Sequence, residues 1–250
     1  MKIVKYSYLD NKIKYGKVSG RFIKPMINSI YDDELLFEKK SSINLNDCKL
    51  YLPINSSKII GVAQNFRKKN QKNDPLFFLK TSNSLCLENS KIQLPKKSNT
   101  WGESELAFVI KKKINKKITL EKCKSYILGY VLANDITASY NNGHDHHLAL
   151  SKSLNNFCPI SNFIETNFNF KNKIIEGFHN NQLIRRANTS KFIFNPHQIL
   201  SFLSGLIELN PGDLILTGAP PRVIERKYLK KYDKYTVKIE SLGQITNSFK

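Results

Sequence analysis

Cysteine, arginine and long apolar runs are scarce in this 250-residue chain. Its 4 cysteines stand singly and form no CxxC pair, so the sequence gives no support to a structural zinc site or a redox motif. Single cysteines of this kind are usually small buried side chains of intracellular proteins. No apolar run approaches the roughly 18–20 residues that span a bilayer, and residues 1–6 lack the apolar core of a signal peptide. We therefore expect a soluble, cytoplasmic protein without a membrane segment.

The scarcity of arginine also limits what the large positive charge can mean. The formal net charge is +20, yet only 6 of the 40 basic residues are arginines, and the lysines are spread along the chain. Arginine is the preferred residue for bidentate contacts to phosphates and bases, and no nucleic-acid-binding motif accompanies the charge. Lys, Asn and Ile share A/T-rich codons, so genome composition accounts for many of the lysines. A nucleic-acid partner is therefore not expected. If the protein did bind nucleic acid, its affinity would fall steeply as the salt concentration rises.

Strand-like patterns dominate the chain, which predicts a mostly β (α+β) fold. Apolar residues alternate over 2–8 and 12–18, and a polar stretch near residue 55 indicates a junction. We therefore predict a small β-rich N-terminal domain over 1–55 and a larger domain over 57–250. Residues 196–209 begin with a proline and carry apolar side chains at helical spacing, which predicts a helix. Further strands are expected at 57–62, 76–79, 106–110, 126–133, 174–178, 192–194, 214–216 and 235–239.

A pair of carboxylates marks the candidate site. Glu103 and Glu105 stand two residues apart before an apolar run, so in a strand their side chains would share one face. Asp135 directly follows the apolar run 126–133. Oxygen ligands of this type suit a hard divalent cation such as Mg²⁺ or Mn²⁺. The residues alone leave two alternatives open. The glutamates could be exposed and paired with lysines, and Asp135 could be a turn residue.

Eight segments, taken in order, carry a further signal: SKIIGVAQNFRKK, PLFFLKTSNS, WGESELAFVI, ILGYVLANDITA, LSKSLNNFCPIS, ANTSKFIF, LNPGDLILTGAP and VKIESLGQITNSF. Together they resemble motifs of the fumarylacetoacetate hydrolase (FAH) family. The resemblance runs from about Ser57 to the end of the chain, and residues 1–55 are similar to the small domain that precedes this fold in many bacterial members. It implies the mixed β-sheet roll or sandwich of the family, a homodimer, and an enzyme that acts on a 2-oxo acid.

The resemblance also implies roles for individual residues. In the family, two glutamates and an aspartate at the positions of Glu103, Glu105 and Asp135 bind Mg²⁺, sometimes Mn²⁺. Lys152 matches a lysine that lies near the metal and the substrate oxygens, so it is the expected catalytic residue. The expected substrate-binding residues are Arg67, Lys80, Thr217 and Gly218. The metal would polarise the 2-oxo group and favour an enolate by stabilising its charge.

The implied reaction is hydrolysis, isomerisation or decarboxylation of an acylpyruvate, oxaloacetate or an unsaturated 2-oxo dicarboxylate. Hydrolytic members carry a histidine–glutamate dyad on a lid, where this sequence has Lys69 and Lys72. Neither lysine is a good general base near neutral pH. Two alternatives are therefore open. The protein could be a tautomerase, isomerase or decarboxylase without hydrolytic activity, or it could be a catalytically inactive member of the family. His146 or His147 in the segment GHDHH could supply the missing base, and a second metal site is the other interpretation of that segment.

Overall fold

The computed structural model describes the whole chain except residues 10, 40, 67–73, 141–144 and 146–147. Its main element is a 13-stranded mixed sheet with the strand order β4-β3-β2-β1-β15-β12-β11-β18-β6-β7, and β5, β8 and β14 pair beside this path. The strands of this large sheet are β1 (Lys2–Ser7), β2 (Lys14–Ser19), β3 (Phe22–Pro25), β4 (Ile43–Asn44), β5 (Lys49–Tyr51), β6 (Ile59–Ala63), β7 (Leu76–Lys80), β8 (Leu85–Leu87), β11 (Ser104–Ile110), β12 (Ile127–Asn134), β14 (Cys158–Ile160), β15 (Phe163–Glu165) and β18 (Leu214–Leu216).

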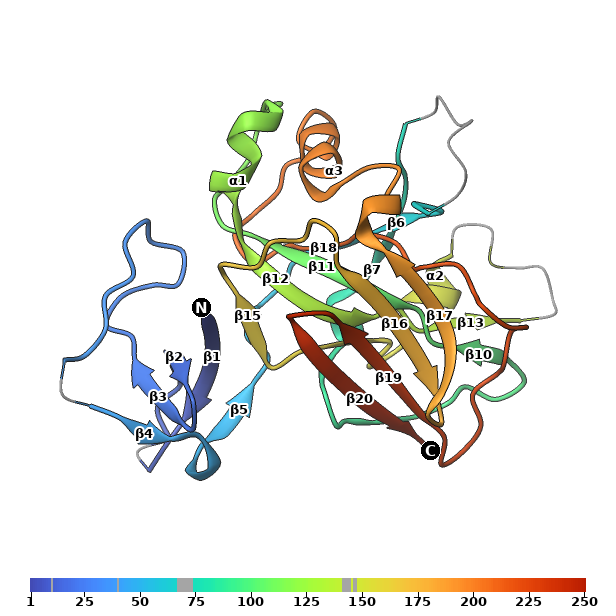
Figure 1. Cartoon of the computed structure of the whole chain (residues 1–250), viewed down its shortest axis with the longest axis horizontal. Coiled ribbons are helices and arrows are strands. Elements are labelled where there is room, and N and C mark those ends of the chain that lie inside the picture. The colour runs from blue at the N-terminus through green and yellow to red at the C-terminus, as the bar shows by residue number, and fades with distance from the viewer. Residues whose placement is uncertain (10, 40, 67–73, 141–144, 146–147) are drawn as a thin grey trace.

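A second sheet has five strands in the order β17-β16-β19-β20-β9, and β10 forms a separate pair with β13. The bounds are β9 (Lys91–Ile92), β10 (Asn99–Trp101), β13 (Thr137–Ser139), β16 (Ile174–His179), β17 (Gln182–Asn188), β19 (Lys234–Ile239) and β20 (Gly243–Phe249). The helices are α1 (Cys123–Tyr126), α2 (Ala149–Lys152) and α3 (Pro196–Leu203), with 3₁₀ turns at Leu45–Asp47, Ser82–Ser84, Leu120–Lys122 and Thr189–Lys191. Figure 1 shows α1 and α3 next to each other beyond one end of the sheets. No helix in the described part of the chain is long and apolar enough to cross a membrane.

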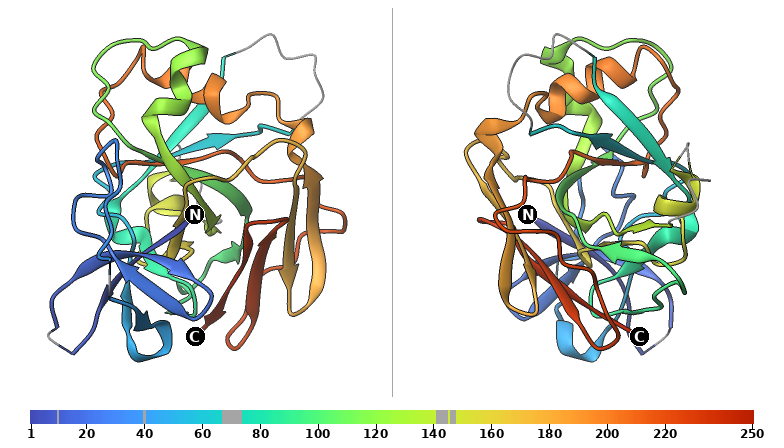
Figure 2. Two further views of the ribbon diagram at one scale, coloured as in Figure 1. Left: turned by 60° about the vertical axis from the view of Figure 1, so that its left-hand side comes forward. Right: turned by 90° about the vertical axis from the view of Figure 1, so that its right-hand side faces the viewer.

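The two sheets share one hydrophobic core. Phe108 and Leu132 from the large sheet lie in the same buried cluster as Val237 and Ile245 from the five-stranded sheet. The opposite face of β11 contributes Ala107 and Val109 to a second buried cluster. Both faces of β11 are therefore covered, and every residue of that strand is buried. The expected mostly β fold is confirmed, and Figure 2 shows the two sheets from the side.

The strands of residues 1–55 continue the large sheet. Strand β1 pairs antiparallel with β15, with Ile3 opposite Ile164, and it also pairs with β2 and β5. Alternate side chains of β1 point to opposite faces, so Ile3 joins the second cluster while Val4 and Tyr6 form a small core with Ile23. Figure 1 shows this N-terminal part in blue at one side of the molecule. The domain boundary at residues 55–57 stays a prediction.

Two expectations about secondary structure were wrong. Residues 192–194 form no strand. The Ile193 N–H donates to the Asn65 backbone oxygen and the Phe194 N–H donates to Asn65 Oδ1, both at 2.8 Å, so neither pairs with a strand. The predicted helix is also shorter than expected and ends at Leu203. Turn residues that include Gly205 follow it, and glycine is a poor helix former. The apolar residues after Leu203 therefore keep the helical spacing in the sequence, although the helix has already ended.

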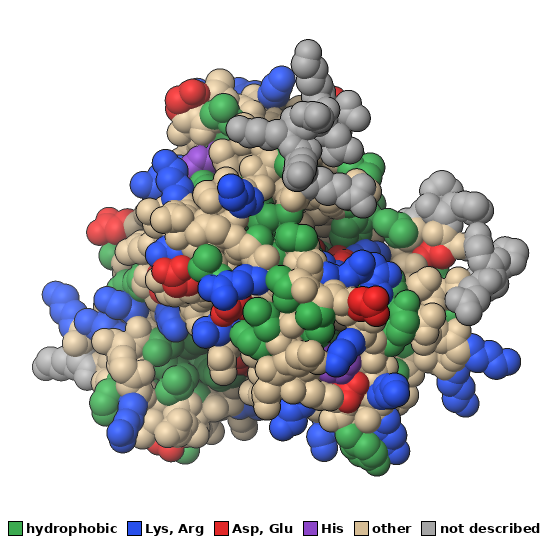
Figure 3. All heavy atoms as spheres, turned by 45° about the vertical axis from the view of Figure 1, so that its right-hand side comes forward, with side chains coloured by type: hydrophobic (Ala, Val, Ile, Leu, Met, Phe, Trp, Pro, Cys, Tyr) green, Lys and Arg blue, Asp and Glu red, His purple; other side chains and the backbone are tan. Residues whose placement is uncertain are grey.

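Basic side chains occur at many places on the surface. Figure 3 shows them over one face of the molecule with apolar and acidic side chains between them. Exposed pairs such as Lys113 with Glu208, at 3.1 Å, bring some of the lysines next to carboxylates. This spread agrees with the even distribution of lysines along the sequence.

The carboxylate of Asp233 connects the ends of two β-hairpins, and it gives the fold a testable pH dependence. It accepts hydrogen bonds from Asn180 Nδ2 at 2.7 Å and from the Lys230 N–H at 2.8 Å, and it contacts His179 Nε2 at 2.7 Å. Burial would raise the pKa of Asp233, but these partners outweigh burial and lower the pKa below its ordinary value. Its stabilising contribution is therefore present above the unfolded pKa and is lost as the pH falls through the folded pKa.

We expect Asp233→Asn to lower the free energy of unfolding at pH 7 by about 1 kcal/mol, because solvent near the carboxylate screens part of its hydrogen bonding. The difference from the wild type should begin to narrow near pH 4, where the unfolded carboxylate becomes protonated, and should close once the pH falls below the lowered folded pKa. Urea denaturation between pH 3 and 7 measures it. The exposed residue Asp74 provides the control Asp74→Asn. Parallel pH profiles for the wild type and Asp233→Asn would contradict the expectation.

Candidate active site

Four of the charged residues singled out in the sequence meet at one cavity of about 690 Å³. Glu103, Glu105, Asp135 and Lys152 all line it. Lys80 does not line the cavity, since it is buried behind Asp135 and donates from Nζ to Asp135 Oδ1 at 2.7 Å. The cavity size lies within the range of pockets that enclose small ligands.

The register of β11 and β12 brings the three carboxylates together. Ser104 pairs with Asn134, so Asp135, which follows β12, lies beside Glu103, which precedes β11. The Asp135 N–H donates to the Glu103 carbonyl oxygen at 2.9 Å, and the Glu103 N–H donates to Asn134 Oδ1 at 3.0 Å. Glu105 is two residues further along, and it lines the same cavity. The sequence spacing of the two glutamates therefore corresponds to one shared wall of the cavity.

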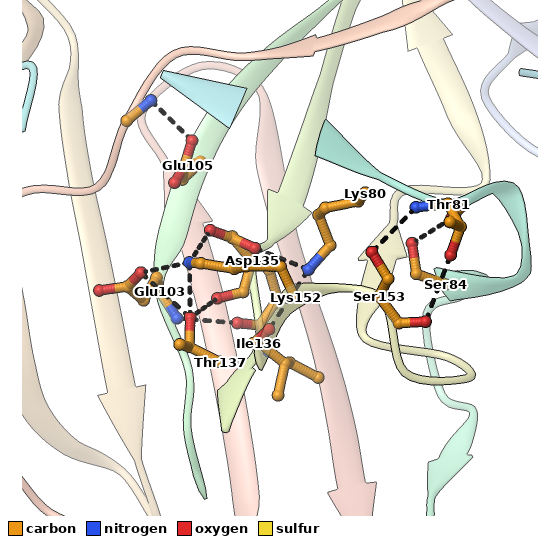
Figure 4. A network of polar contacts seen from close by, with 12 residues as sticks. Lys80, Thr81, Ser84, Glu103, Glu105, Asp135, Ile136, Thr137, Lys152 and Ser153 are labelled. Atoms are coloured by element: carbon orange, nitrogen blue, oxygen red, sulfur yellow. Dashed lines mark hydrogen bonds and ion pairs between the residues drawn. The ribbon is translucent and has the colours of Figure 1, made fainter. Parts of the chain in front are cut away.

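Lys152 reaches the carboxylates from the short helix α2. The carboxylate of Asp145 accepts hydrogen bonds from the backbone N–H groups of residues 150 and 151, at 3.0 and 2.6 Å, and so fixes this turn. Lys152 Nζ donates to Asp135 Oδ2, to Glu103 Oε2 at 3.1 Å and to Thr137 Oγ1 at 2.6 Å. Figure 4 shows the ammonium group between the two carboxylates. The lysine is thus both buried and held in one orientation.

The electrostatic balance around Lys152 keeps it charged. Burial alone would lower its pKa, but the charges of Asp135 and Glu103 outweigh burial and raise the pKa above its ordinary value. Burial would likewise raise the pKa of Glu103, but Lys152 and then Arg185 lower that pKa to about 2. At neutral pH this part of the site therefore holds a charged ammonium group beside the ionised carboxylate of Glu103.

Glu105 has a different environment from the other two carboxylates. Burial first, and then the charges of Asp135 and Glu103, raise the pKa of Glu105 well above its ordinary value. Its Oε2 accepts a hydrogen bond from the Gly218 N–H at 2.6 Å, and Figure 4 shows it apart from the Lys152 network. Gly218 has a φ of +94°, and a Cβ there would lie 2.9 Å from the Val62 carbonyl oxygen, so only glycine fits this contact.

The remaining residues expected from the sequence have different placements. Thr217 is fully buried, and its hydroxyl donates to the Leu106 carbonyl oxygen at 2.8 Å, so its side chain supports β11. Five residues lie outside the described residues: Arg67, Lys69, Lys72, His146 and His147. Their roles stay predictions.

Arg185 is a site residue that the sequence analysis missed. It comes from β17, and its Nη2 donates to Glu103 Oε1 at 2.6 Å while its Nη1 donates to the Pro220 carbonyl oxygen at 2.6 Å. The guanidinium therefore ties Glu103 to the segment after Gly218. No local motif surrounds Arg185, and the only signal in the sequence is an arginine in a chain that has few of them. Two further arginines, Arg222 and Arg226, also line the cavity.

The three carboxylates are suitable ligands for a divalent cation, but their side chains do not surround a common point. Among the described residues, no group of three His, Cys, Asp or Glu side chains is arranged to hold a metal ion. The Lys152 ammonium instead lies between Glu103 and Asp135, where a cation would otherwise be attracted. Burial, and then the charges of Asp135 and Glu103, disfavour the charged form of Glu105. A hard divalent ion bound by the three carboxylates would offset this repulsion.

Comparison with known proteins places the chain in a family. Residues 54–250 match the family described as fumarylacetoacetate (FAA) hydrolase, C-terminal. The chain belongs to the fumarylacetoacetate hydrolase family. The mitochondrial oxaloacetate tautomerase fahd2 of Xenopus laevis is 31% identical to it over 225 residues, which cover 82% of this chain and 69% of the relative. The resemblance of the eight sequence segments to the FAH family is thereby confirmed.

Solved structures confirm the FAH-type fold. The crystal structure of 5-carboxymethyl-2-hydroxymuconate delta-isomerase from Mycobacterium smegmatis has a TM-score of 0.90 at 26% identity, covering 100% of this chain and 99% of that chain. Maleylpyruvate hydrolase from Sphingobium sp. SYK-6, solved with manganese(II) and pyruvate, shares the fold with a TM-score of 0.79 at 22% identity, covering 100% and 98%. The FAH-family fold therefore extends over the whole chain, including the strands of residues 1–55.

Proposed function

We propose that this FAH-family protein is a divalent-metal-dependent enzyme that interconverts the keto and enol forms of a 2-oxo acid. Isomerisation and decarboxylation can proceed through the same enolate. The observation that carries this proposal is the buried ammonium of Lys152, held by Glu103, Asp135 and Thr137 at the cavity wall. Enolisation breaks a C3–H bond, with the proton passing to solvent water, and places negative charge on the former carbonyl oxygen. A fixed cation beside that oxygen stabilises the transition state. A tautomerase and an isomerase among the relatives fit this reaction class.

Each charged residue at the cavity has a task in this proposal. When bound by Glu103, Glu105 and Asp135, a Mg²⁺ or Mn²⁺ ion would supply Lewis-acid stabilisation of the substrate's 2-oxo and carboxylate oxygens. Manganese in the maleylpyruvate hydrolase structure supports a divalent ion in this fold. Lys152 would donate from Nζ to the oxygen on which charge develops, and its raised pKa keeps it charged. Lys80 would hold Asp135 in orientation from behind.

Hydrolysis has weaker support from the described residues. It requires a base that removes a proton from water, and the described residues lining the cavity include no histidine. The lid positions Lys69 and Lys72, and the candidate bases His146 and His147, lie outside the described residues. Keto–enol interconversion, isomerisation and decarboxylation need no activated water. A catalytically inactive family member is the other alternative, and it predicts no turnover of any 2-oxo acid.

Turnover of oxaloacetate tests the proposed function. We expect the purified protein to accelerate the decay of the enol form, followed by its ultraviolet absorbance, to lose this activity in EDTA, and to regain it with excess Mg²⁺ or Mn²⁺. Acylpyruvate cleavage measured in parallel reports on hydrolysis. Activity that persists unchanged in EDTA would contradict the metal requirement, and no turnover of either acid with either metal would support the inactive alternative.

We also propose that the protein is a homodimer, as the family resemblance implies. Strand β7 is the last strand in the order of the large sheet, and its Leu76 and Leu79 are exposed by 60% and 57%. Leu148 and Leu150 beside it are exposed by 37% and 41%. An apolar edge strand is a common site of association between chains. Light scattering after size-exclusion chromatography should give about twice the chain mass of 28.8 kDa, and a mass of one chain would contradict the dimer.

A further inference from the structure

Two arginines on one wall of the cavity are not needed by the reaction proposed above. Arg222 and Arg226 line the same cavity as the three carboxylates, in the segment that follows Gly218. The other arginine of the cavity, Arg185, is engaged with Glu103 and the Pro220 carbonyl oxygen. Among the described residues, neither Arg222 nor Arg226 forms an ion pair with a carboxylate. Their charges are thus available to a ligand.

The backbone fixes the direction in which Arg222 points. It forms an antiparallel bridge with Arg185, and the neighbouring Val223 N–H donates to the Ile184 carbonyl oxygen at 2.8 Å. Paired residues of an antiparallel bridge carry their side chains on the same face. Arg222 therefore extends on the face where Arg185 reaches Glu103, and both side chains line the cavity.

Arg226 is held by an aromatic ring. Its guanidinium carbon lies 3.9 Å from the centre of the Trp101 ring, which is cation–π contact distance. Burial, and then the positive charge of Arg222, lower the pKa of Arg226, so the two guanidinium groups are close enough to repel each other. A stacked guanidinium keeps its N–H groups at its edge free for a planar carboxylate.

The charges of the cavity do not balance at this wall. Lys80, Lys152 and Arg185 form ion pairs with two of the three carboxylates, those of Glu103 and Asp135. At the wall of Arg222 and Arg226, the only acidic residue among the described lining residues is the exposed Glu225. Positive charge is therefore in excess there, at the same cavity that Lys152 lines.

We propose that Arg222 and Arg226 form an anion subsite that binds a second carboxylate of the substrate, so that the enzyme prefers 2-oxo dicarboxylates to 2-oxo monocarboxylates. This inference rests on the proposed function, since the first carboxylate and the 2-oxo group would bind at Lys152 and at the divalent ion that Glu103, Glu105 and Asp135 would hold. The second carboxylate would accept hydrogen bonds from the two guanidinium groups, which relieves the repulsion between them.

A pair of stable acids that differ in one carboxylate tests the subsite. Titration calorimetry with the Mg²⁺-loaded protein would compare 2-oxoglutarate with 2-oxopentanoate. We expect the wild type to bind 2-oxoglutarate at least about tenfold more tightly, and the variant Arg222→Gln/Arg226→Gln to reduce this preference to below about threefold. Arg186→Gln is the matched control, because Arg186 is an exposed neighbour of Arg185 that pairs with Glu176 and does not line the cavity. Thermal unfolding of each variant monitors folding.

The outcomes separate this inference from the proposed function. Equal binding of the two acids by the wild type, or an unchanged preference in the double variant, would overturn the subsite and leave the proposed function intact. Binding of neither acid by the Mg²⁺-loaded wild type would overturn both. A loss of preference in Arg186→Gln equal to that in the double variant would show a general charge effect and would also overturn the subsite.

Discussion

Lys152→Met is expected to lower the turnover of oxaloacetate by about 10²- to 10³-fold, the usual effect of removing one donor that stabilises a developing oxyanion. Methionine keeps most of the length of the side chain and removes its charge. The two carboxylates that Lys152 contacts keep other cationic partners, since Arg185 still pairs with Glu103 and Lys80 with Asp135. The variant should therefore fold, and the loss should lie in kcat. Steady-state kinetics with saturating Mg²⁺ measures it.

Two further variants give this prediction its controls. Lys91→Met removes a lysine from an exposed position on β9 and should leave turnover unchanged. Lys152→Arg keeps the positive charge but changes its shape, so it should recover part of the activity. If Lys152→Met turns over oxaloacetate within about threefold of the wild-type rate, Lys152 does not act on the reacting oxygen.

Asp135→Asn is expected to produce the largest loss of stability in the metal-free protein. Asp135 is fully buried, and its carboxylate lies between the ammonium groups of Lys80 and Lys152. Loss of its charge leaves two buried cations with one fewer anion, and removal of one member of a buried ion pair costs about 3–5 kcal/mol. For a chain of this size such a loss lowers the melting temperature by about 6–20 °C.

Thermal and urea unfolding after EDTA treatment measure this loss. The control is Asp33→Asn, whose carboxylate pairs with Lys111 and Lys112 at the surface. It should change stability little, because exposed ion pairs contribute little. A double variant, Asp135→Asn/Lys80→Met, should recover part of the loss because it removes one of the uncompensated cations. If Asp135→Asn and Asp33→Asn unfold at the same temperature, the buried network is not a determinant of stability.

The sequence predicted the placement of the two glutamates better than that of the other site residues. Both Glu103 and Glu105 line the cavity as their spacing suggested, with Glu105 in β11 and Glu103 directly before it. The position of Asp135 beside them depends on the register of β11 with β12, which no local pattern specifies. Lys152 was found through the family resemblance alone, since a four-residue helix has no periodic signal.

The parts that the sequence analysis missed depend on long-range pairing. Arg185 is 82 residues from Glu103 in the chain, and it reaches the site because β17 belongs to the second sheet. Arg222 lies beside Arg185 because an isolated antiparallel β-bridge pairs the two residues. The strand expected at residues 192–194 failed for a similar reason, since its backbone donors bond to the distant Asn65. Local patterns thus predicted the strands of this fold better than the contacts between them.

Binding of a divalent ion is the central claim of this account, and calorimetric titration tests it most directly. Mg²⁺ and Mn²⁺ would be titrated into protein that has been treated with EDTA and then freed of it. The account predicts one ion per chain for the wild type and an affinity at least about tenfold weaker for Glu105→Gln, whose side chain keeps its shape but loses its charge. Absence of binding to the wild type, or equal affinity for Glu105→Gln, would contradict a metal site formed by Glu103, Glu105 and Asp135.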